Sequence, residues 1–571
     1  MAVKEGEAEV NYRKEVVKML EKETGLKPQE IDKVIEVPPS LDFGDFAFPC
    51  FILSKKLKKA PNMIAEELLK KILPTKNIKK IEIKGPYLNF FINRDLFNKD
   101  IIENILKEKD DYGKAAKKKE KIMIEYPGPN TNKPLHLGHL RNMLIGKSVQ
   151  NILEASGYKV LPVNINNDRG IHICKSMLAY KKWGKNREPN KKSDHFVGDF
   201  YVLYTKKEKE NPKLEEEAHE MLKKWEAGDK ETRAIWKKMN KWALDGFKET
   251  YKNFGIRFVK EYNESDHYDG GKKIVTQALK NGIFKKDDND NIIADLKELG
   301  EKVVLRSDGT SVYITQDINL AYLRYNEFDP DTLIYVVASE QNLHFSQLFA
   351  ILKMLGFKKS SGLYHLNYGM VYLPEGKMKS REGTVVDTDN LIEQMTQMAK
   401  KEIEDRHKLS EKELLKRCKD IGFGALIFFI LKYDPSKDFV FDPKESISFE
   451  GETGPYIQYA HARINSILKK SKGLLTEVDY SLLKTDEEKN IITKLAEYPV
   501  VVSQAANNYK PSLVARHILE LSQTFNEFYH KSPILKAEGN LRGTRIALIL
   551  AIKQVLKNGL GLLGIDAPLE M

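Results

Sequence analysis

The sequence predicts a multidomain α/β protein, with a Rossmann-type parallel sheet in a central domain, an N-terminal α/β domain and an all-helical C-terminal part. A strand-like segment at Lys121–Tyr126, a Pro- and Asn-rich loop, a helical pattern over Gly138–Ser156 and a second strand, LPVNIN, follow one another. This order is a βαβ unit of the nucleotide-binding kind. From about Asp389 onward, apolar residues repeat at helical spacing. The length of 571 residues suggests about three or four domains.

Residues 1–108 are expected to form the N-terminal domain. Helical patterns cover Tyr12–Glu23 and Ala60–Ile72, and an alternating strand lies around Ile81–Ile92. The charged stretch 109–120 that follows is weakly patterned and most simply serves as a solvated linker, although its lysines also suit contact with RNA.

The central domain is expected to span 121–388, with an insertion at about 184–300 that contains a charge-rich helical stretch, Phe200–Phe254. Strand-like segments return at Lys302–Leu305, Val312–Thr315 and Leu333–Ala338. Beyond the sheet we expect a helical stem at 389–447, broken by two prolines, and a helical domain at 448–571.

Composition limits the compartment and the partners. Lys and Arg number 94 against 82 Asp and Glu with both signs interspersed, which fits a large anionic partner or a lysine-rich surface chosen for solubility. Three cysteines without a CxxC pair support neither a disulfide framework nor a thiolate zinc site. The N-terminus lacks an apolar core for secretion, and no apolar run approaches the roughly twenty residues of a membrane span. We therefore expect a cytoplasmic protein without membrane contact.

The segment His136-Leu137-Gly138-His139 lies where the first strand of the nucleotide-binding unit passes into its helix. Free backbone N–H groups and the positive end of the helix dipole favour phosphate there, and imidazoles three residues apart can reach the same phosphate oxygens. Gly138 leaves room for a flat base or ribose against the backbone. The alternatives are a pair of metal ligands or ordinary helix-entry histidines, but zinc would need further ligands at suitable spacing.

A second basic segment, GKMKSREG at 376–383, is expected to fold over a triphosphate, unless it is a solvated turn. Together and in this order, the two segments resemble the two signature motifs of class I aminoacyl-tRNA synthetases. Flanking segments narrow the resemblance to arginyl-tRNA synthetases and extend it over essentially the whole chain. These segments are EYPGPNTNKPLHLGHLRN, SDGTSVYITQDINLAY, VASEQNLHFSQLF, EGETGPYIQYAHAR, LLGIDAPLEM, PPSLDFGDFAFP and IKGPYLNFFIN.

The resemblance implies an arginine–tRNA ligase that uses ATP and Mg²⁺. Such an enzyme forms arginyl-adenylate from L-arginine and transfers the arginyl group to the 3′-terminal adenosine of tRNA(Arg). The resemblance further implies that tRNA binds before the first step and that the protein is a monomer. The alternatives are another class I synthetase, an inactive tRNA-binding relative, and a generic nucleotidyltransferase, which would not explain the tyrosine-bearing C-terminal part.

A pocket for arginine must contain buried acid, because the guanidinium is planar and permanently charged. Asp317 follows Tyr313 by four residues, which places both on one face if the segment is helical. A helix-cap or surface carboxylate is the alternative for Asp317. The resemblance assigns the guanidinium to Tyr313, Asp317 and Glu264. It assigns the remaining pocket, with the amino and carboxylate end of arginine, to Glu125, Gly128, Asn130, His139 and Gln341.

The resemblance also assigns the ATP site and the groups that stabilise the departing phosphates. The ATP site falls on His136, Gly138, His139, His344, Met370, Lys377 and Met378. The catalytic set falls on Lys133, His136, Gly138, His139, Lys377, Lys379 and Ser380.

The chain departs from the family pattern in both signature regions. It reads Pro127-Gly128-Pro129-Asn130 where the family commonly has Ser-Ser-Pro-Asn, so a substrate hydroxyl contact is absent or replaced by backbone. Lys379 and Ser380 stand where the class pattern has serine and lysine. The family is thought to use the lysine before its first signature instead, which matches Lys133.

Tyr456, Tyr459 and Arg463 share one helix face by their spacing. Aromatic rings beside a guanidinium form a stacking platform for unpaired bases, whereas the alternative is a pair of tyrosines packed in a core. The resemblance implies that this face receives the anticodon loop. The resemblance also assigns Tyr529 and Met571 to the anticodon-binding face. It assigns contacts with the tRNA elbow to Tyr87 and Asn89.

Overall fold

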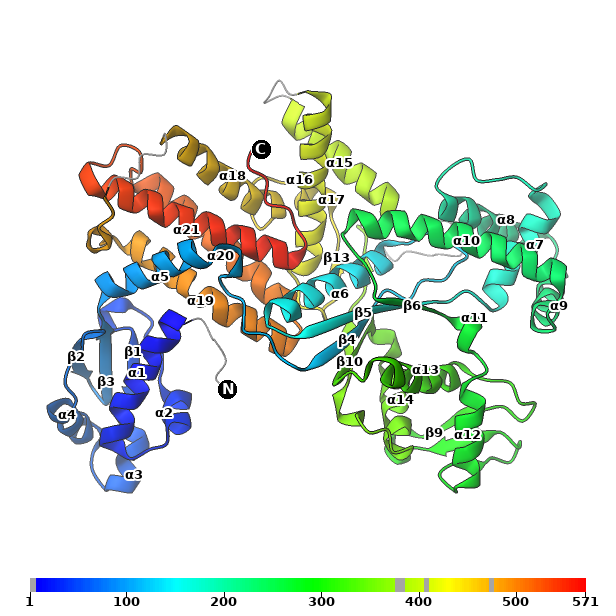
Figure 1. Ribbon diagram of the computed structural model, residues 1–571, viewed down its shortest axis with the longest axis horizontal. Coiled ribbons are helices and arrows are strands. Elements are labelled where there is room, and N and C mark those ends of the chain that lie inside the picture. The colour runs from blue at the N-terminus through cyan, green and yellow to red at the C-terminus, as the bar shows by residue number, and fades with distance from the viewer. Residues whose placement is uncertain (1–6, 375–385, 405–409, 472–476) are drawn as a thin grey trace.

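The computed structural model describes residues 7–374, 386–404, 410–471 and 477–571. A central sheet separates an N-terminal α/β domain and a bundle of C-terminal helices on one side from two further groups of elements on the other (Figure 1). These two groups, coloured in greens, come from the middle of the chain.

The N-terminal domain packs helices against a small antiparallel sheet. Strands β1 (Phe46–Pro49), β2 (Ile78–Lys84) and β3 (Tyr87–Ile92) form this sheet in the order β1-β3-β2. The single strand expected around Ile81–Ile92 is wrong, because Gly85, with a φ of 58°, reverses the chain into a hairpin. The helices are α1 (Glu7–Thr24), α2 (Pro28–Val34), α3 (Ser54–Leu57), α4 (Pro61–Lys71) and α5 (Arg94–Glu108).

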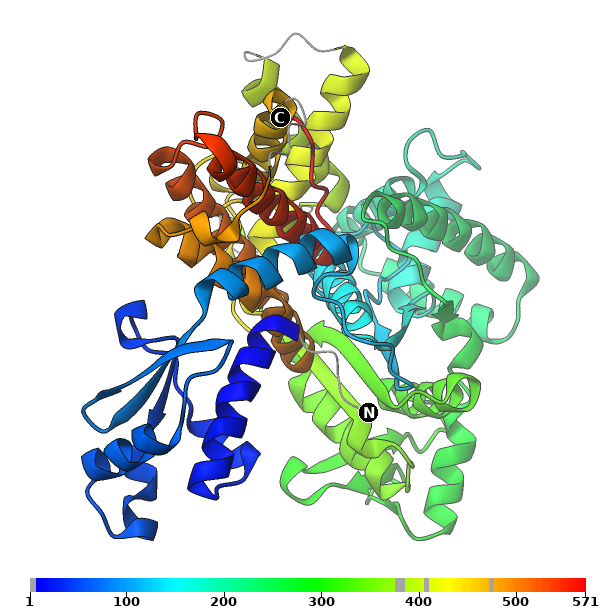
Figure 2. The same ribbon diagram turned by 60° about the vertical axis from the view of Figure 1, so that its left-hand side comes forward.

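Helix α5 carries the chain from the N-terminal domain to the C-terminal helices, as Figure 2 shows. The stretch after it is not solvated along its whole length, contrary to the expectation for 109–120. Tyr112 is 7% exposed, its hydroxyl donates to the carbonyl of Leu495 over 2.9 Å, and its ring stacks on Tyr498. One aromatic residue therefore anchors an otherwise charged connector.

Among the residues that the structure describes, five parallel strands form the central sheet, in the order β11-β10-β4-β5-β6. They are β4 (Lys121–Glu125), β5 (Lys159–Asn166), β6 (Lys260–Asn263), β10 (Thr332–Ala338) and β11 (Leu363–Tyr368). The strand order reverses between β4 and β10, and open α/β sheets bind ligands at the carboxyl ends of strands beside such a switch point. Helix α6 (Leu137–Ala155) begins there, after the loop that leaves β4.

The expected insertion is divided into two excursions. Between them the chain returns to the sheet as β6, which pairs with β5 at the edge of the sheet. The sequence of β6, Lys-Glu-Tyr-Asn, has no apolar run that would reveal a strand. The first excursion comprises α7 (Ile171–Trp183), α8 (Ser193–Glu210), α9 (Leu214–Glu226) and α10 (Lys230–Asn253). The second comprises α11 (Glu264–His267), α12 (Gly271–Lys280) and an antiparallel sheet of β7 (Lys285–Lys286), β8 (Ile292–Asp295) and β9 (Glu301–Leu305).

Helix α13 (Tyr313–Phe328) begins where a strand was expected at Val312–Thr315. The Val312 N–H donates to Thr315 Oγ1 over 3.0 Å, as in a capping box, and this contact starts the helix. The strand prediction is wrong because the β-branched residues of this segment favour a strand when the cap is not recognised. Helix α14 (Asn342–Met354) follows β10.

The stem and the C-terminal bundle are helical, as expected. The stem contains α15 (Thr388–Glu404), α16 (Glu411–Leu431), β13 (Phe439–Val440) and α17 (Pro443–Ser446), and β13 pairs with β12 (Val371–Tyr372) of the preceding central domain. The bundle contains α18 (Gly454–Lys470), α19 (Asp486–Asn508), α20 (Pro511–Lys531) and α21 (Gly539–Leu563). By length and composition α21 could cross a membrane, which the sequence reading overlooked, but 61% of its most apolar window is buried inside the protein. This burial fits a core helix of the bundle.

Arg141, in the second turn of α6, ties the central sheet to the stem. It is 1% exposed, and its guanidinium donates to the carbonyl oxygens of Gly369, Met370, Pro435 and Lys437. These carbonyls flank β12 and β13, which pair with each other. A single buried cation therefore fixes both chain segments against α6.

Replacing Arg141 with Met should lower the free energy of unfolding by about 3 kcal/mol or more, because four carbonyl oxygens lose a charged donor. The midpoint of thermal unfolding measures this loss. Arg516→Met is the control, since the Arg516 side chain is 80% exposed beside Glu520 and its removal should leave the midpoint nearly unchanged. Equal midpoints for the two variants would contradict the bracing role.

Candidate functional site

The loop after β4 lies at the carboxyl edge of the sheet, beside the switch point. The Gly128 N–H donates to Asn164 Oδ1 over 3.1 Å, and the Asn167 N–H donates to the Pro129 carbonyl over 2.9 Å. Gly128 has a φ of 68°, a left-handed conformation that favours glycine over the serine of the family pattern. Asn130 is exposed, so its side chain is accessible to a ligand.

The two predicted histidines meet at the start of α6. His136 is the N-cap residue, and the Gly138 N–H donates to its Nδ1 over 3.1 Å. The His136 N–H in turn donates to Nδ1 of His139 over 3.2 Å, and the ring centroids are 3.8 Å apart. Because both Nδ1 atoms accept, each neutral ring carries its proton on Nε2 and offers that N–H to an anion.

Gly138 is needed here for the imidazole. A Cβ at this position would lie 3.0 Å from Cε1 of His136, which is tighter than ordinary van der Waals contact. The glycine therefore keeps space for the capping ring, in addition to the space for a base that the sequence suggested.

The electrostatics keep both rings uncharged. Burial lowers the pKa of His136 to about 3, and the positive charge of Lys133 contributes. Burial also lowers the pKa of His139 well below its ordinary value, with His136 and Lys133 adding to the effect. At neutral pH the site therefore presents neutral N–H donors, and Lys133 supplies the formal positive charge.

Predicted acids gather near the first turns of α13. Burial raises the pKa of Glu264 to about 7, opposed by Arg169, while the charge of Asp317 adds to the rise. Burial likewise raises the pKa of Glu125, opposed by Arg324, and Asp317 again adds. These carboxylates disfavour one another's charge, so a cationic ligand placed among them would relieve that repulsion.

Arginines of the chain itself already partner two of these acids. Arg324 is 1% exposed and forms an ion pair with Glu125, and Arg169 lies 3.7 Å from Glu264. Sequence reasoning missed both residues. Arg324 follows Asp317 by seven residues, so the same helical spacing that was used for Asp317 carried a signal for it.

Asp317 lies at the boundary of the protein interior, and is less buried than a preformed guanidinium pocket requires. Its carboxylate is 2.7 Å from Nε2 of His344, and the two side chains are 31% and 20% exposed. Tyr313 is 76% exposed and, with His344, lines a cavity of about 540 Å³. Gln341 is also exposed. Tyr313 and His344 therefore line this cavity, Asp317 adjoins it through His344, and Gln341 is not part of its lining.

On the C-terminal bundle, α18 and α20 bring the predicted aromatic residues together. The Arg463 guanidinium lies 4.6 Å from the ring centroid of Tyr459 and 5.2 Å from that of Tyr529. Asn526, which sequence reasoning missed, donates to the Tyr456 hydroxyl over 2.8 Å and accepts from Arg463 over 2.9 Å. Asn526 precedes Tyr529 by three residues, a helical spacing that could have revealed it.

The C-terminal tail up to Glu570 packs along another face of α18, whereas the anticodon-loop contact expected for Met571 stays a prediction. The tail accepts hydrogen bonds from Gln458 and Asn465 at the carbonyls of Asp566 and Leu569, both over 2.9 Å. These α18 positions lie on the helix face opposite Tyr456, Tyr459 and Arg463. The tail therefore follows the far side of α18.

The predicted elbow contacts differ from each other in exposure. Asn89 is 3% exposed within β3, so a direct contact of its side chain with RNA does not fit this structure. Tyr87 is half-buried, with its ring edge-to-face against Phe51 at 6.0 Å. Tyr87 and Asn89 lie on the same face of β3, so strand alternation does not account for their difference in exposure.

Comparison with known protein families covers most of the chain. The model described as "tRNA synthetases class I (R), catalytic domain" matches residues 101–443. The models described as "Arginyl tRNA synthetase N terminal domain" and "DALR anticodon binding domain" match residues 11–92 and 457–571. The chain belongs to the arginyl-tRNA synthetase family. This assignment confirms the predicted fold class and the predicted enzyme class, an ATP-using aminoacyl-tRNA synthetase.

Individual relatives agree with the family models. An arginine–tRNA ligase of Treponema denticola is 46% identical over 566 residues, covering 94% of this chain and 96% of the relative. One from Borrelia turicatae is 42% identical over 578 residues, with 98% of each chain covered. The solved arginyl-tRNA synthetase of Thermus thermophilus has a TM-score of 0.83 at 25% identity, covering 98% of this chain and 99% of that chain.

The second signature segment of this arginyl-tRNA synthetase carries four of the predicted site residues. Lys377, Met378, Lys379 and Ser380 lie outside the described residues. Met370, just before them, is held by its backbone, since its N–H donates to Asp438 over 2.7 Å and its carbonyl accepts from the Arg141 guanidinium. The β12 strand that follows leads directly to the signature segment.

The His136 and His139 rings are expected to stay neutral between about pH 5 and pH 8, with the proton on Nε2. Selective ¹⁵N-histidine spectra report both properties, and His136→Asn assigns the signal. An unfolded imidazole takes up a proton near its ordinary pKa of about 6.5, so these depressed values make stability fall as the pH falls below that point. Titration of either ring within this window would contradict the neutral pair.

Proposed function

We propose that this synthetase activates L-arginine with ATP to form arginyl-adenylate and transfers the arginyl group to the 3′-terminal adenosine of tRNA(Arg). One observation carries the proposal. The neutral imidazole donors at the start of α6 and the acids around α13 gather at the same edge of the parallel sheet. A triphosphate and a cationic amino acid need these opposite environments side by side.

The ATP phosphates would lie at the N-terminus of α6, where the helix dipole is positive and the Nε2–H groups of His136 and His139 are donors. The carboxylate of arginine attacks the α-phosphate, a phosphorus–oxygen bond forms, and pyrophosphate leaves with its electron pair. Lys133 and, from the signature segment, Lys377 and Lys379 stabilise the charge on that leaving group. The chain supplies positioning and charge, and no side-chain nucleophile is needed.

Mg²⁺ is proposed to enter with the nucleotide. Among the described residues, one group offers three metal-ligand atoms close together, namely Asp194, His195 and Asp389. The Lys192 ammonium already bonds both of these carboxylates, at 2.9 Å and 2.7 Å, so this group does not fit a resident cation. Magnesium bound to ATP phosphates commonly keeps waters as its remaining ligands and would counter the phosphate charge.

The arginine guanidinium is proposed to bind between Asp317, Glu264 and the ring of Tyr313, taking the place of His344 beside Asp317. Glu125 contributes negative charge from beneath, and Asn130, His139 and Gln341 are assigned to the amino and carboxylate end. Released from Asp317, His344 would be able to contact the nucleotide, which fits its predicted place in the ATP site. The exposure of Tyr313 suits a lid residue that covers the substrate on binding.

The remaining parts are proposed to bind the tRNA. Residues 1–108 would contact its elbow through Tyr87, and 448–571 would receive the anticodon loop, with 389–447 as the stem between them and the sheet domain. Interspersed positive charge over the surface would support this contact. We propose a cytoplasmic monomer, since each predicted site is assembled within one chain.

Charging of total tRNA with each radiolabelled amino acid in turn is expected to succeed with arginine alone.

Asp317→Ala should raise the KM for arginine by roughly 30- to 1,000-fold and weaken discrimination against lysine, because a charged hydrogen-bond partner is lost. Asp308→Ala, an exposed carboxylate in a nearby turn, is the control. Unchanged selectivity in the Asp317 variant would contradict this arginine site.

Tyr459→Ala should raise the KM for tRNA by roughly 5- to 100-fold, since a stacked base is worth about 1–3 kcal/mol. The KM values for arginine and ATP should stay unchanged. Tyr364→Ala, which removes a tyrosine that is 42% exposed on β11, serves as the matched control. Equal KM values for tRNA in the two variants would argue for a purely structural aromatic cluster on α18.

A further inference from the structure

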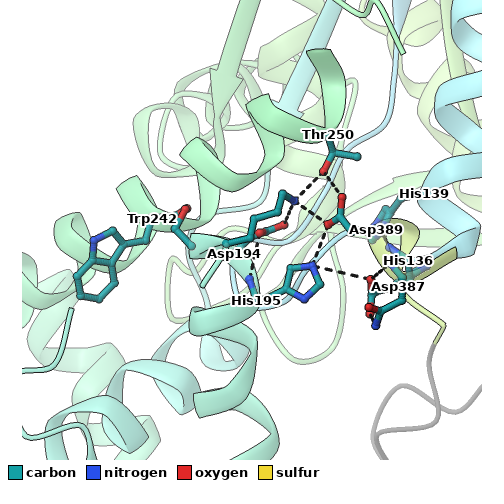
Figure 3. A network of polar contacts seen from close by, with 11 residues as sticks. His136, His139, Asp194, His195, Trp242, Thr250, Asp387 and Asp389 are labelled. Carbon is teal, nitrogen blue, oxygen red and sulfur yellow. Dashed lines mark hydrogen bonds and ion pairs between the residues drawn. The ribbon is translucent and has the colours of Figure 1, made fainter. Parts of the chain in front are cut away.

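A polar network joins the first excursion to the start of the stem (Figure 3). The Lys192 ammonium, just before α8, donates to Asp194 over 2.9 Å, to Thr250 over 2.7 Å and to Asp389 over 2.7 Å. These oxygens match the three N–H bonds of the ammonium. Asp194 is fully buried, and Asp389 lies in the first turn of α15. The lysine therefore joins three helices at one point.

His195 adds a second link between the same parts. Its Nε2 lies 2.8 Å from Asp389 Oδ2 and 3.8 Å from Asp387 Oδ1. The side chains of His195 and Asp389 are 19% and 21% exposed, so water screens this pair only in part. Asp389 thus receives both contacts from the first excursion.

The backbone beside Asp389 holds the two residues that flank His136. The Leu137 N–H donates to the Val386 carbonyl over 3.2 Å, and the Thr388 N–H donates to the Leu135 carbonyl over 2.8 Å. His136 and Asp387 face each other in this short antiparallel bridge. Figure 3 shows His136 beside Asp387.

We propose that Lys192 and His195 are positioning residues for the ATP site. By holding Asp389, they fix the segment Val386–Thr388 against the backbone that carries His136. This inference rests on the proposed role of His136 at the ATP phosphates. It gives the first excursion a part in the reaction, although its helices lie outside the sheet domain.

The balance of charge makes the contact depend on the protonation of His195. Formal negative charges on Asp194, Asp387 and Asp389 face Lys192 and, when it is protonated, His195. The hydrogen bond to Asp389 raises the pKa of His195, although burial opposes the rise. A raised imidazole pKa means that the pair is fully formed below about pH 6.5 and is lost as the pH rises through the raised value.

The test measures aminoacylation kinetics of the full-length enzyme with Lys192→Gln, His195→Gln and Asp389→Asn. Each variant should raise the KM for ATP by about 5- to 30-fold, leave the KM for arginine unchanged, and change kcat less than KM. In the wild type, the KM for ATP should increase from about pH 6 to pH 9, and His195→Gln should flatten that increase. His219→Gln, at an exposed histidine of α9, is the matched control and should match the wild type.

Two outcomes would overturn the proposal. One is a His195→Gln enzyme with the wild-type KM for ATP and the wild-type pH profile. The other is a lower unfolding midpoint for all three variants without a change in either quantity, which would show a merely structural network. His136→Ala separates this failure from a failure of the proposed function. Retained ATP-dependent charging in that variant would contradict the ATP site at His136, whereas loss of charging there, with an unchanged KM for ATP in the three network variants, would contradict only the positioning role.

Discussion

The hydrogen bonds from backbone N–H groups to the Nδ1 atoms of His136 and His139 are the constraint on which the site depends. They use the first free N–H groups of α6 and fix both rings at the point where the helix dipole is most positive. They also fix the tautomer, so the rings present Nε2–H without charge. Two charged imidazoles 3.8 Å apart beside Lys133 would repel each other, and burial prevents that state.

The opposite charge preference arises a short distance away on the same sheet. Glu125 ends β4, whose neighbour across the switch point is β10, and Glu264 begins α11 after β6. Parallel strands place their carboxyl ends at one edge, so acids that are far apart in the chain gather there. Arg324 and Arg169 balance part of this charge. This partial compensation lowers the energetic cost of burying the carboxylates, and the acids still attract a cation.

The stem is fastened by contacts of two kinds, one to α6 and one to the first excursion. Arg141 binds carbonyls beside β12 and β13, whereas Lys192 and His195 both bind the carboxylate of Asp389 at the start of α15. The second signature segment lies in the chain between these two attachments.

The sequence by itself determined the family, the βαβ unit at β4 and α6, the helical stem and bundle, and the spacing of Tyr313 with Asp317 and of Tyr456 with Tyr459 and Arg463. These are local properties, set by periodicity, caps and short motifs. Only the tertiary structure decided that β6 belongs to the sheet, that Asn89 is buried, that the tail follows the far side of α18, and that Arg324, Asn526 and the Lys192 network partner predicted residues. The physical reason is that such contacts join residues distant in the chain, and their energies depend on burial and on the charges that folding brings together.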